Sequence, residues 1–152
     1  MSSVLPRDRD ALDVLGQAAF FRDLTEAQRR AVFALSRMQE CDAGEHLYRI
    51  GEPAASFYVL VRGIVRLTIG LDQRVASAGD ILQCGQVFGW AALTPGANRR
   101  IASAFCVTPA SVLAIDGAGL VAMMDRDHTL GYHLLRRLIL LVTGTLTLGA
   151  AG

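Results

Sequence analysis

The feature that most constrains the fold is a series of short strand-like segments between about residue 41 and residue 115. Residues 57–61 form an apolar run, Arg62 and Gly63 indicate a turn, and residues 64–69 largely alternate apolar with polar side chains. Such alternation is typical of a strand with one face in solvent. Further strand-like runs cover residues 45–50, 74–77, 101–107 and 111–115. Many short strands separated by glycine-rich turns indicate a β-sandwich or barrel.

Helical patterns flank this region on both sides. Thr25 and Gln28 have the spacing of a capping box, and apolar residues follow at helical intervals as far as Met38. Asp116 is expected to cap a short helix, and Asp127 a longer, very apolar one. We therefore expect one α+β domain over residues 1–152. It would have a helical part at 8–40, strands at 41–115 and C-terminal helices at 116–148.

Composition and charge exclude several classes of protein. The 152 residues carry 15 basic and 14 acidic side chains and are 52% hydrophobic, which suits one ordinary core and not a disordered tail. The balanced charge lacks the basic excess that nucleic-acid binding requires. No apolar run is long enough for a membrane span, and residues 1–14 do not resemble a secretory signal. We expect a cytoplasmic protein.

Cysteine and histidine provide no obvious site for metal or catalysis. The three cysteines, Cys41, Cys84 and Cys106, are odd in number and far apart, which favours unpaired thiols in a reducing compartment. The histidines do not cluster with them, and His46 is the only histidine among the strands. The ligand set of a metal site and the base of a nucleophilic enzyme are both missing. We expect no metal and no enzymatic activity.

Residues 85–103 are the candidate site. A helical turn is expected after Gly89, Pro95 and Gly96 form a loop, and the chain returns at Arg99 and Arg100. Backbone N–H groups at a helix start, facing a guanidinium, can bind an anion. An arginine pair beside such a loop is also common on a solvated surface. The residues alone leave both interpretations open.

An ordered set of landmarks extends beyond this segment. They are Ala43-Gly44-Glu45, Gly51-Glu52, residues 57–66, Ala78-Gly79-Asp80, Phe88-Gly89 and Arg100-Ile-Ala-Ser103. From about Phe20 to Leu141 the chain thereby resembles the cyclic nucleotide-binding domain of the catabolite-activator and protein-kinase-A regulatory-subunit superfamily. The resemblance implies a β-jelly-roll (double-stranded β-helix) barrel with helices at both ends. The Gly-Trp form at residues 89–90 is similar to a bacterial subgroup of such regulators.

The resemblance also implies roles for residues of the segment. Arg100 matches the family's phosphate-binding arginine, whereas Trp90 replaces the glutamate that accepts a hydrogen bond from the ribose 2′-OH. An indole donates and cannot accept, so this contact is lost; the ring would either fill the sugar pocket or stack on a planar group. Strand alternation places Ser103 on the face opposite Arg100. The implied ligand-binding residues are Phe88, Gly89, Trp90, Ala91, Arg99, Arg100, Ile101 and Ser103.

The long C-terminal helix pairs with its twin in the superfamily. The residues expected at a homodimer seam are Leu134, Leu135, Leu138, Ile139, Leu141 and Val142, with a separate protein partner as the alternative. Thr143 and Thr145 are candidates for contacts with the base, or ordinary helix-end residues. Because the sequence ends at Gly152, without a helix-turn-helix, we expect no DNA binding by this chain alone.

Two functions follow as expectations. The first is a non-enzymatic ligand-sensing domain for cAMP, cGMP or another small anion, with no further cofactor assigned. The second is a degenerate, ligand-free domain that acts as a dimerisation or protein-interaction module. In that case Trp90 would belong to the core, and Arg99 and Arg100 would be surface charges.

Overall fold

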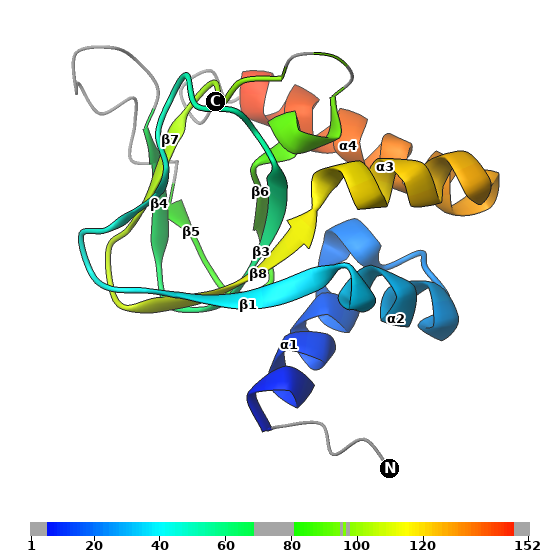
Figure 1. Cartoon of the computed structure of the whole chain (residues 1–152), viewed down its shortest axis with the longest axis horizontal. Helices are drawn as coiled ribbons and strands as arrows, with labels where there is room; N and C mark the ends of the chain where they lie inside the picture. Colours follow the sequence, from blue (N-terminus) through cyan, green and yellow to red (C-terminus); the bar gives the residue numbers. More distant parts are fainter. Residues whose placement is uncertain (1–5, 69–80, 95, 97, 148–152) are drawn as a thin grey trace.

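The computed structural model describes residues 6–68, 81–94, 96 and 98–147. Helices lie at both ends of the chain and two sheets lie between them (Figure 1). The elements are α1 (Pro6–Gln17), η1 (Ala19–Phe21), α2 (Glu26–Ala34), β1 (Ser36–Cys41), β2 (His46–Tyr48), β3 (Ser56–Arg62), β4 (Val65–Thr68), β5 (Ile81–Leu82), β6 (Val87–Phe88), η3 (Trp90–Leu93), β7 (Ser103–Cys106), β8 (Ala110–Asp116), α3 (Gly117–Arg126) and α4 (His128–Thr147). No helix among these described ranges is both long and apolar enough to cross a bilayer.

The described strands form two four-stranded antiparallel sheets, in the orders β1-β8-β3-β6 and β2-β7-β4-β5. The sheets face each other, and the helices pack on the outer side of the first (Figure 1). The mixed helix-and-sheet fold is therefore as predicted and is consistent with a jelly roll. Closure into a single barrel is not shown. The strand expected at 74–77 lies outside the described residues.

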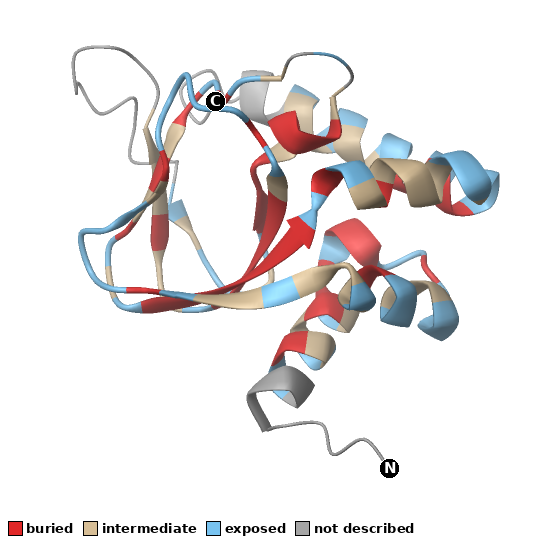
Figure 2. Cartoon of the chain, in the orientation of Figure 1, coloured by how far each residue is buried: buried red, intermediate tan, exposed pale blue. Residues whose placement is uncertain are grey.

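Alternation along β3 and β8 divides the interior into two cores. Both strands are buried along most of their length (Figure 2). Tyr58 and Ala114 point into the inter-sheet core, whereas Phe57 and Ile115 point outward into the helical core. The inter-sheet core consists of Cys41, Tyr48, Tyr58, Leu60, Val65, Phe88, Ala104, Cys106, Ala110, Val112 and Ala114.

The N-terminal helical region is shorter than the predicted 8–40. The capping box of Thr25 and Gln28 is confirmed, but α2 ends at Ala34 and β1 begins at Ser36. Met38, which fits the helical spacing, lies in β1 and pairs with Leu113 of β8. Pairing with a buried strand overrides the local periodicity here, because β1 completes the edge of the first sheet.

The C-terminal helices begin where their caps predict. The side chain of Asp116 accepts a hydrogen bond from the Gly119 N–H at the start of α3. The side chain of Asp127 accepts one from the Leu130 N–H at the start of α4. Each cap satisfies a backbone donor that the first helical turn leaves unpaired.

The expectation of three unpaired cysteines is wrong for two of them. Cys41 and Cys106 form a disulfide between residues 65 apart in sequence, with their Cα atoms 6.5 Å apart. Cys41 ends β1 and Cys106 ends β7, so the bond joins the two sheets across the inter-sheet core. The pair could not be predicted from the sequence, because the two cysteines are far apart in the chain and come together only when the two sheets face each other. Cys84 is a free, exposed thiol.

Candidate functional site

Arg100 is the centre of the candidate site. It precedes β7, and only 4% of its surface is exposed. Its Nη1 donates to the Gly89 carbonyl at 3.0 Å and its Nη2 to the Ser56 carbonyl at 2.7 Å. The guanidinium therefore points into the protein, between the start of β3 and the end of β6.

Two tyrosine rings lie against this guanidinium, and a third aromatic ring packs on them. Its Cζ lies 4.0 Å from the ring centroid of Tyr48 and 5.6 Å from that of Tyr58. The Tyr58 ring stacks on Phe88 at 5.1 Å and on Tyr48 at 5.8 Å, measured between centroids. Cation–π attraction holds the planar arginine against these faces. The three rings make the site a buried aromatic wall with one positive charge.

Burial sets the electrostatics of the site. Loss of solvation lowers the pKa of Arg100, and the nearby Tyr48 and Tyr58 hydroxyls partly oppose this. Burial also raises the pKa of Tyr48, so its phenol stays neutral. No carboxylate in the described part of the chain forms an ion pair with Arg100, and its buried Nε has no hydrogen-bond partner. A buried cation with an unpaired donor favours an anion beside it.

Gly89 and η3 position the segment that follows β6. Gly89 has φ +83°, and its backbone leads directly into the short helix η3. A Cβ at this position would lie 2.9 Å from Arg100 Nη1 and 3.1 Å from Tyr58 Cδ2. Asn98 Nδ2 donates to the Ala91 carbonyl at 2.9 Å and ties the returning loop to η3. The predicted helical turn after Gly89 is thus present as a single 3-10 turn.

The structure brings together only part of the expected ligand-binding set. Phe88, Gly89 and Arg100 meet at the buried aromatic wall. Trp90 is half-buried against the helical core, where Ala91 is also buried, so its indole does not fill the space between the sheets. Arg99 is exposed and donates to the Gly51 carbonyl at 3.3 Å.

The remaining two members of the set face outward. Ile101 is 53% exposed, and the Ser103 hydroxyl accepts a hydrogen bond from the Ile50 N–H at 2.8 Å. Ala102 and Ala104 are buried, as is Arg100. This is the alternation expected from the sequence. Ile101 and Ser103 consequently lie away from the guanidinium.

Sequence reasoning missed Tyr48, Tyr58 and the Ser56 carbonyl. Tyr58 could have been found from alternation, since the 56–58–60 positions of one strand share a face. Tyr48 could not, because it belongs to the second sheet. Only the packing of the two sheets brings its ring over Arg100.

The expected seam residues of α4 divide between two faces. Leu134 is fully buried, and Leu138 and Leu141 pack against the helical core. These three residues therefore stabilise the fold of their own domain. Leu135 and Ile139 are about half exposed, and Val142 is partly so. Thr143 is exposed, and the side chain of Thr145 lies outside the described residues. Among the described residues, no three His, Cys, Asp or Glu side chains lie together as a metal site would need.

Comparisons with known proteins agree with this architecture. A model of the cyclic nucleotide-binding domain family matches residues 38–127, more than half of the chain. The chain is 26% identical over 117 residues to a Rhodopseudomonas palustris protein named "Putative potassium channel protein", a match that spans 77% of this chain but only 28% of that protein.

Two solved structures show the same fold. The sensor domain of the transcriptional regulator DNR from Pseudomonas aeruginosa is 20% identical, with a TM-score of 0.74 and coverage of 94% of this chain and 95% of that one. A cyclic nucleotide-binding domain from Methylobacillus flagellatus is 17% identical, with a TM-score of 0.74 and coverage of 93% and 79%.

Proposed function

We propose that this chain, which belongs to the cyclic nucleotide-binding domain family, is a non-enzymatic regulatory domain that senses a small anionic ligand. The observation that carries the proposal is Arg100, a buried cation without a paired carboxylate and with an unpaired Nε among the described residues. The proposed ligand is a cyclic nucleotide, cAMP or cGMP, with its phosphate on Arg100.

The guanidinium is preorganised for a phosphate. Its two Nη atoms donate to the neutral carbonyls of Gly89 and Ser56. A phosphate would replace these bonds with bidentate bonds between two ionised groups, which add geometric specificity as well as binding energy. Tyr48 holds the guanidinium plane in place from one side. Little ordering of the side chain would then be needed on binding.

The sugar would be held differently from that in the wider family. By the family resemblance, Trp90 stands in the sequence where the ribose-binding carboxylate is expected, and its side chain packs against the helical core. Loss of a charge-assisted hydrogen bond costs about 1.5–3 kcal/mol, or roughly ten- to a hundredfold in affinity. We therefore expect weaker cyclic nucleotide binding than a domain with the acidic residue would show.

A signal would pass from the ligand to the C-terminal helices through η3. A Cβ at Gly117, the first residue of α3, would lie only 2.6 Å from the Ala92 carbonyl of η3, so the two elements touch closely. We infer that movement of η3 on ligand binding changes the position of α3 and α4. The ligand would shift the population of two helix positions by its different affinity for each.

Isothermal titration with cAMP and cGMP tests the proposal. We expect the wild type to bind at least one of them with a Kd of about 10 μM or tighter, and Arg100→Ala to lose binding. Arg99→Ala is the matched control, because Arg99 is the exposed neighbour and should bind as the wild type does. Arg100→Lys keeps the charge but loses the planar fork, so it should bind weakly. Equal binding by Arg100→Ala and the wild type would overturn the proposal.

A ligand-free interaction module is the second candidate. The contacts of Arg100 also favour this candidate. Both Nη groups already have acceptors, and the Tyr48 ring covers one face of the guanidinium. The two candidates predict different results for nucleotide bound to the purified protein and for the heat released on titration. Absence of bound nucleotide in native mass spectrometry, together with no heat on titration, would support the module.

A further inference from the structure

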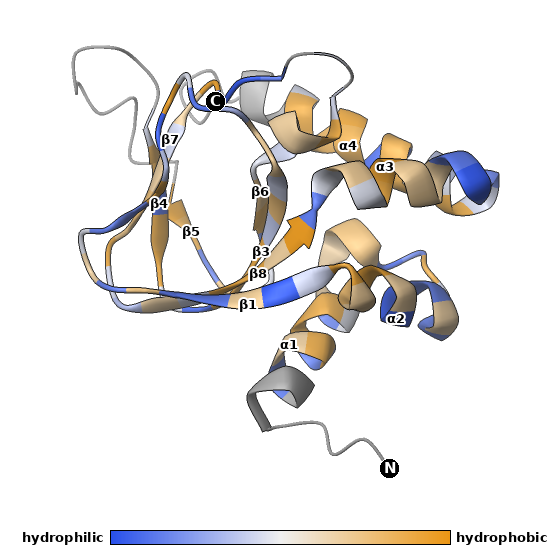
Figure 3. Cartoon of the chain, viewed as in Figure 1, coloured by the Kyte–Doolittle hydropathy of each residue, from blue (hydrophilic) through white to orange (hydrophobic). Residues whose placement is uncertain are grey.

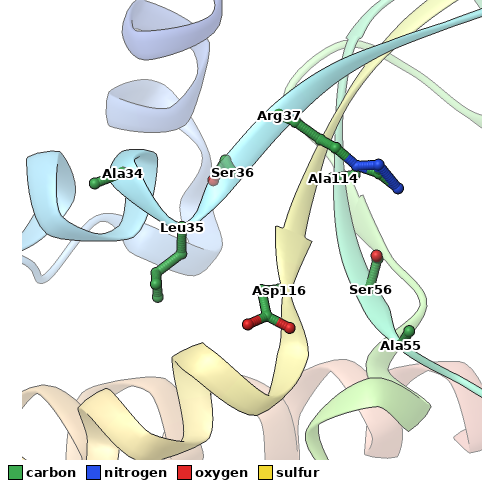
Figure 4. Close-up of a pocket in the computed structure, with 8 residues that line it drawn as sticks. All are labelled: Ala34, Leu35, Ser36, Arg37, Ala55, Ser56, Ala114 and Asp116. Atoms are coloured by element: carbon green, nitrogen blue, oxygen red, sulfur yellow. The ribbon is translucent and has the colours of Figure 1, made fainter.

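A groove lies beside the Arg100 site, at the end of the first sheet where β1 and β3 begin and β8 ends (Figure 4). Its volume is about 480 Å³, within the range of small-molecule sites. It is lined by Ala34, Leu35, Ser36, Arg37, Ala55, Ser56, Ala114 and Asp116. Ser56 links it to the site, because the Ser56 carbonyl accepts the hydrogen bond from Arg100 Nη2.

Arg37 enters this groove from the edge strand β1. It pairs with Ala114, whose side chain belongs to the inter-sheet core, and paired residues share a face of the sheet. In Figure 4 the Arg37 side chain extends past Ala114, on the side of the groove away from Leu35. Arg37 is exposed and forms no hydrogen bond or ion pair with the other described residues. It is therefore a second cation on the inner face.

Gln39 follows two residues later on the same face of β1. It pairs with Val112, another member of the inter-sheet core. Its side-chain oxygen Oε1 is buried and has no hydrogen-bond partner among the residues that the structure describes. A buried acceptor without a partner is costly, and it is satisfied when a ligand donates to it. The edge of β1 thus offers a charged donor beside an unpartnered acceptor.

The distance from this edge to Arg100 suits the two ends of one nucleotide. The register runs from Arg37 to Ala114 and then to Tyr58, whose ring lies against the Arg100 guanidinium. Two strand spacings correspond to roughly 10 Å. Ala114, between them, has a small side chain and lines the groove. A phosphate on Arg100 would leave the other end of the molecule near β1.

We propose that Arg37 and Gln39 recognise the base of the nucleotide and select guanine. This inference rests on the proposed function. Guanine presents the O6 and N7 acceptors that arginine pairs with in bidentate fashion. Its adjacent N1–H and 2-amino groups donate, as the Gln39 Oε1 atom requires. Adenine keeps the N7 acceptor but has an amino group in place of O6, so one of the two paired Arg37 donors would lose its acceptor.

Titration with cGMP, cAMP and inorganic phosphate tests this selection in the full chain. The wild type should bind cGMP about tenfold or more tightly than cAMP. Arg37→Ala should reduce the cGMP affinity to that of cAMP while leaving phosphate binding unchanged. Arg37→Lys, which keeps the charge without the bidentate fork, should also lose most of the preference. Gln39→Leu should weaken cGMP binding because it removes the acceptor.

Arg62→Ala is the matched control, since Arg62 is exposed on β3 and pairs with Ser111, far along the strand from Tyr58. Equal affinity of the wild type for cGMP and cAMP, or an unchanged preference in Arg37→Ala, would overturn the selection while Arg100-dependent binding survived. Failure of both nucleotides to bind the wild type would instead overturn the proposed function, and this inference with it. Thermal melts confirm that each variant is folded.

Discussion

Gly89 combines two requirements in one residue. Its φ of +83° lies where a side chain is strained, and its carbonyl accepts the hydrogen bond from Arg100. A Cβ would in addition meet Arg100 Nη1 and Tyr58 Cδ2 within 3.1 Å. The residue is thus needed both for the turn into η3 and for the space that Arg100 occupies.

We predict that Gly89→Ala destabilises the domain and displaces Arg100. The positive φ alone costs about 1–2 kcal/mol for an alanine, and the contacts add to it. Gly85→Ala is the matched control, because Gly85 has φ +89° with nothing within 4 Å of an added Cβ. Urea unfolding should show a larger loss for Gly89→Ala. Equal losses in the two variants would contradict a close approach of Arg100 to Gly89.

Single residues of the site were predictable where local spacing determines them. The step from Gly89 to Arg100 and the alternation from Arg100 to Ala104 follow from the sequence of one segment. The direction of the Trp90 side chain does not, because the helical core against which it packs is built from distant elements. The contact between Tyr48 and Arg100 could not be predicted for the same physical reason.

At the scale of elements, the junction of α3 and α4 depends on a single carboxylate. Asp127 Oδ2 accepts a hydrogen bond from Gln28 Nε2 of α2 at 2.9 Å, and Oδ1 accepts from the Leu130 N–H at 3.1 Å. The Gln28 bond, followed by the Leu130 bond, lowers the pKa of Asp127. One side chain therefore caps α4 and connects it to the N-terminal helices.

We predict a pH-dependent effect of Asp127→Asn. Because folding lowers the pKa of this carboxyl, its contribution is fully present above its unfolded pKa of about 3.8 and is lost as the pH falls through the lower folded value. The variant should melt below the wild type at pH 7, and the difference should shrink in acid. Asp125→Asn, at an exposed position in the same junction, is the control. A difference that persists at pH 2 would contradict this account.

Elements with strong local signals were predictable, whereas an edge strand was not. The caps at Thr25, Asp116 and Asp127 mark helix starts because each involves neighbours three residues apart. The strand β1 has no such signal: its apolar residues continue the period of α2. Its identity comes from six paired positions with β8, which only the folded sheet provides.

At the scale of the whole molecule, the Cys41–Cys106 disulfide connects the two sheets. We predict that its reduction lowers the free energy of unfolding by about 4 kcal/mol, from the loop-closure entropy of a loop of this length. Urea unfolding with and without reductant measures the change, and Cys84→Ser, which keeps the pair, should respond as the wild type does. Thiol titration of the unfolded, unreduced protein should find one thiol; three thiols would contradict the bond.

The exposed face of α4 is the remaining feature of the whole molecule. Hydrophobic residues cover much of this helix (Figure 3), and Leu130 and Leu134 bury one side of it in the helical core. Tyr132, Leu135 and Ile139 are about half exposed or more, and Val142 is partly exposed. Their 3-4-3 spacing is that of a coiled-coil seam, which a second copy of the same helix can complete.

We therefore predict a homodimer through α4 in place of a separate partner protein. Sedimentation should find the wild type dimeric at micromolar concentration and the Leu135→Glu/Ile139→Glu double variant monomeric, because two buried charges per helix would face each other across the seam. Leu140→Glu is the control, since Leu140 is 62% exposed but lies outside the 3-4-3 positions. A monomeric wild type would contradict the homodimer and would favour another protein as the partner of this face. Dissociation by Leu140→Glu alone would place the contact on a different face of α4.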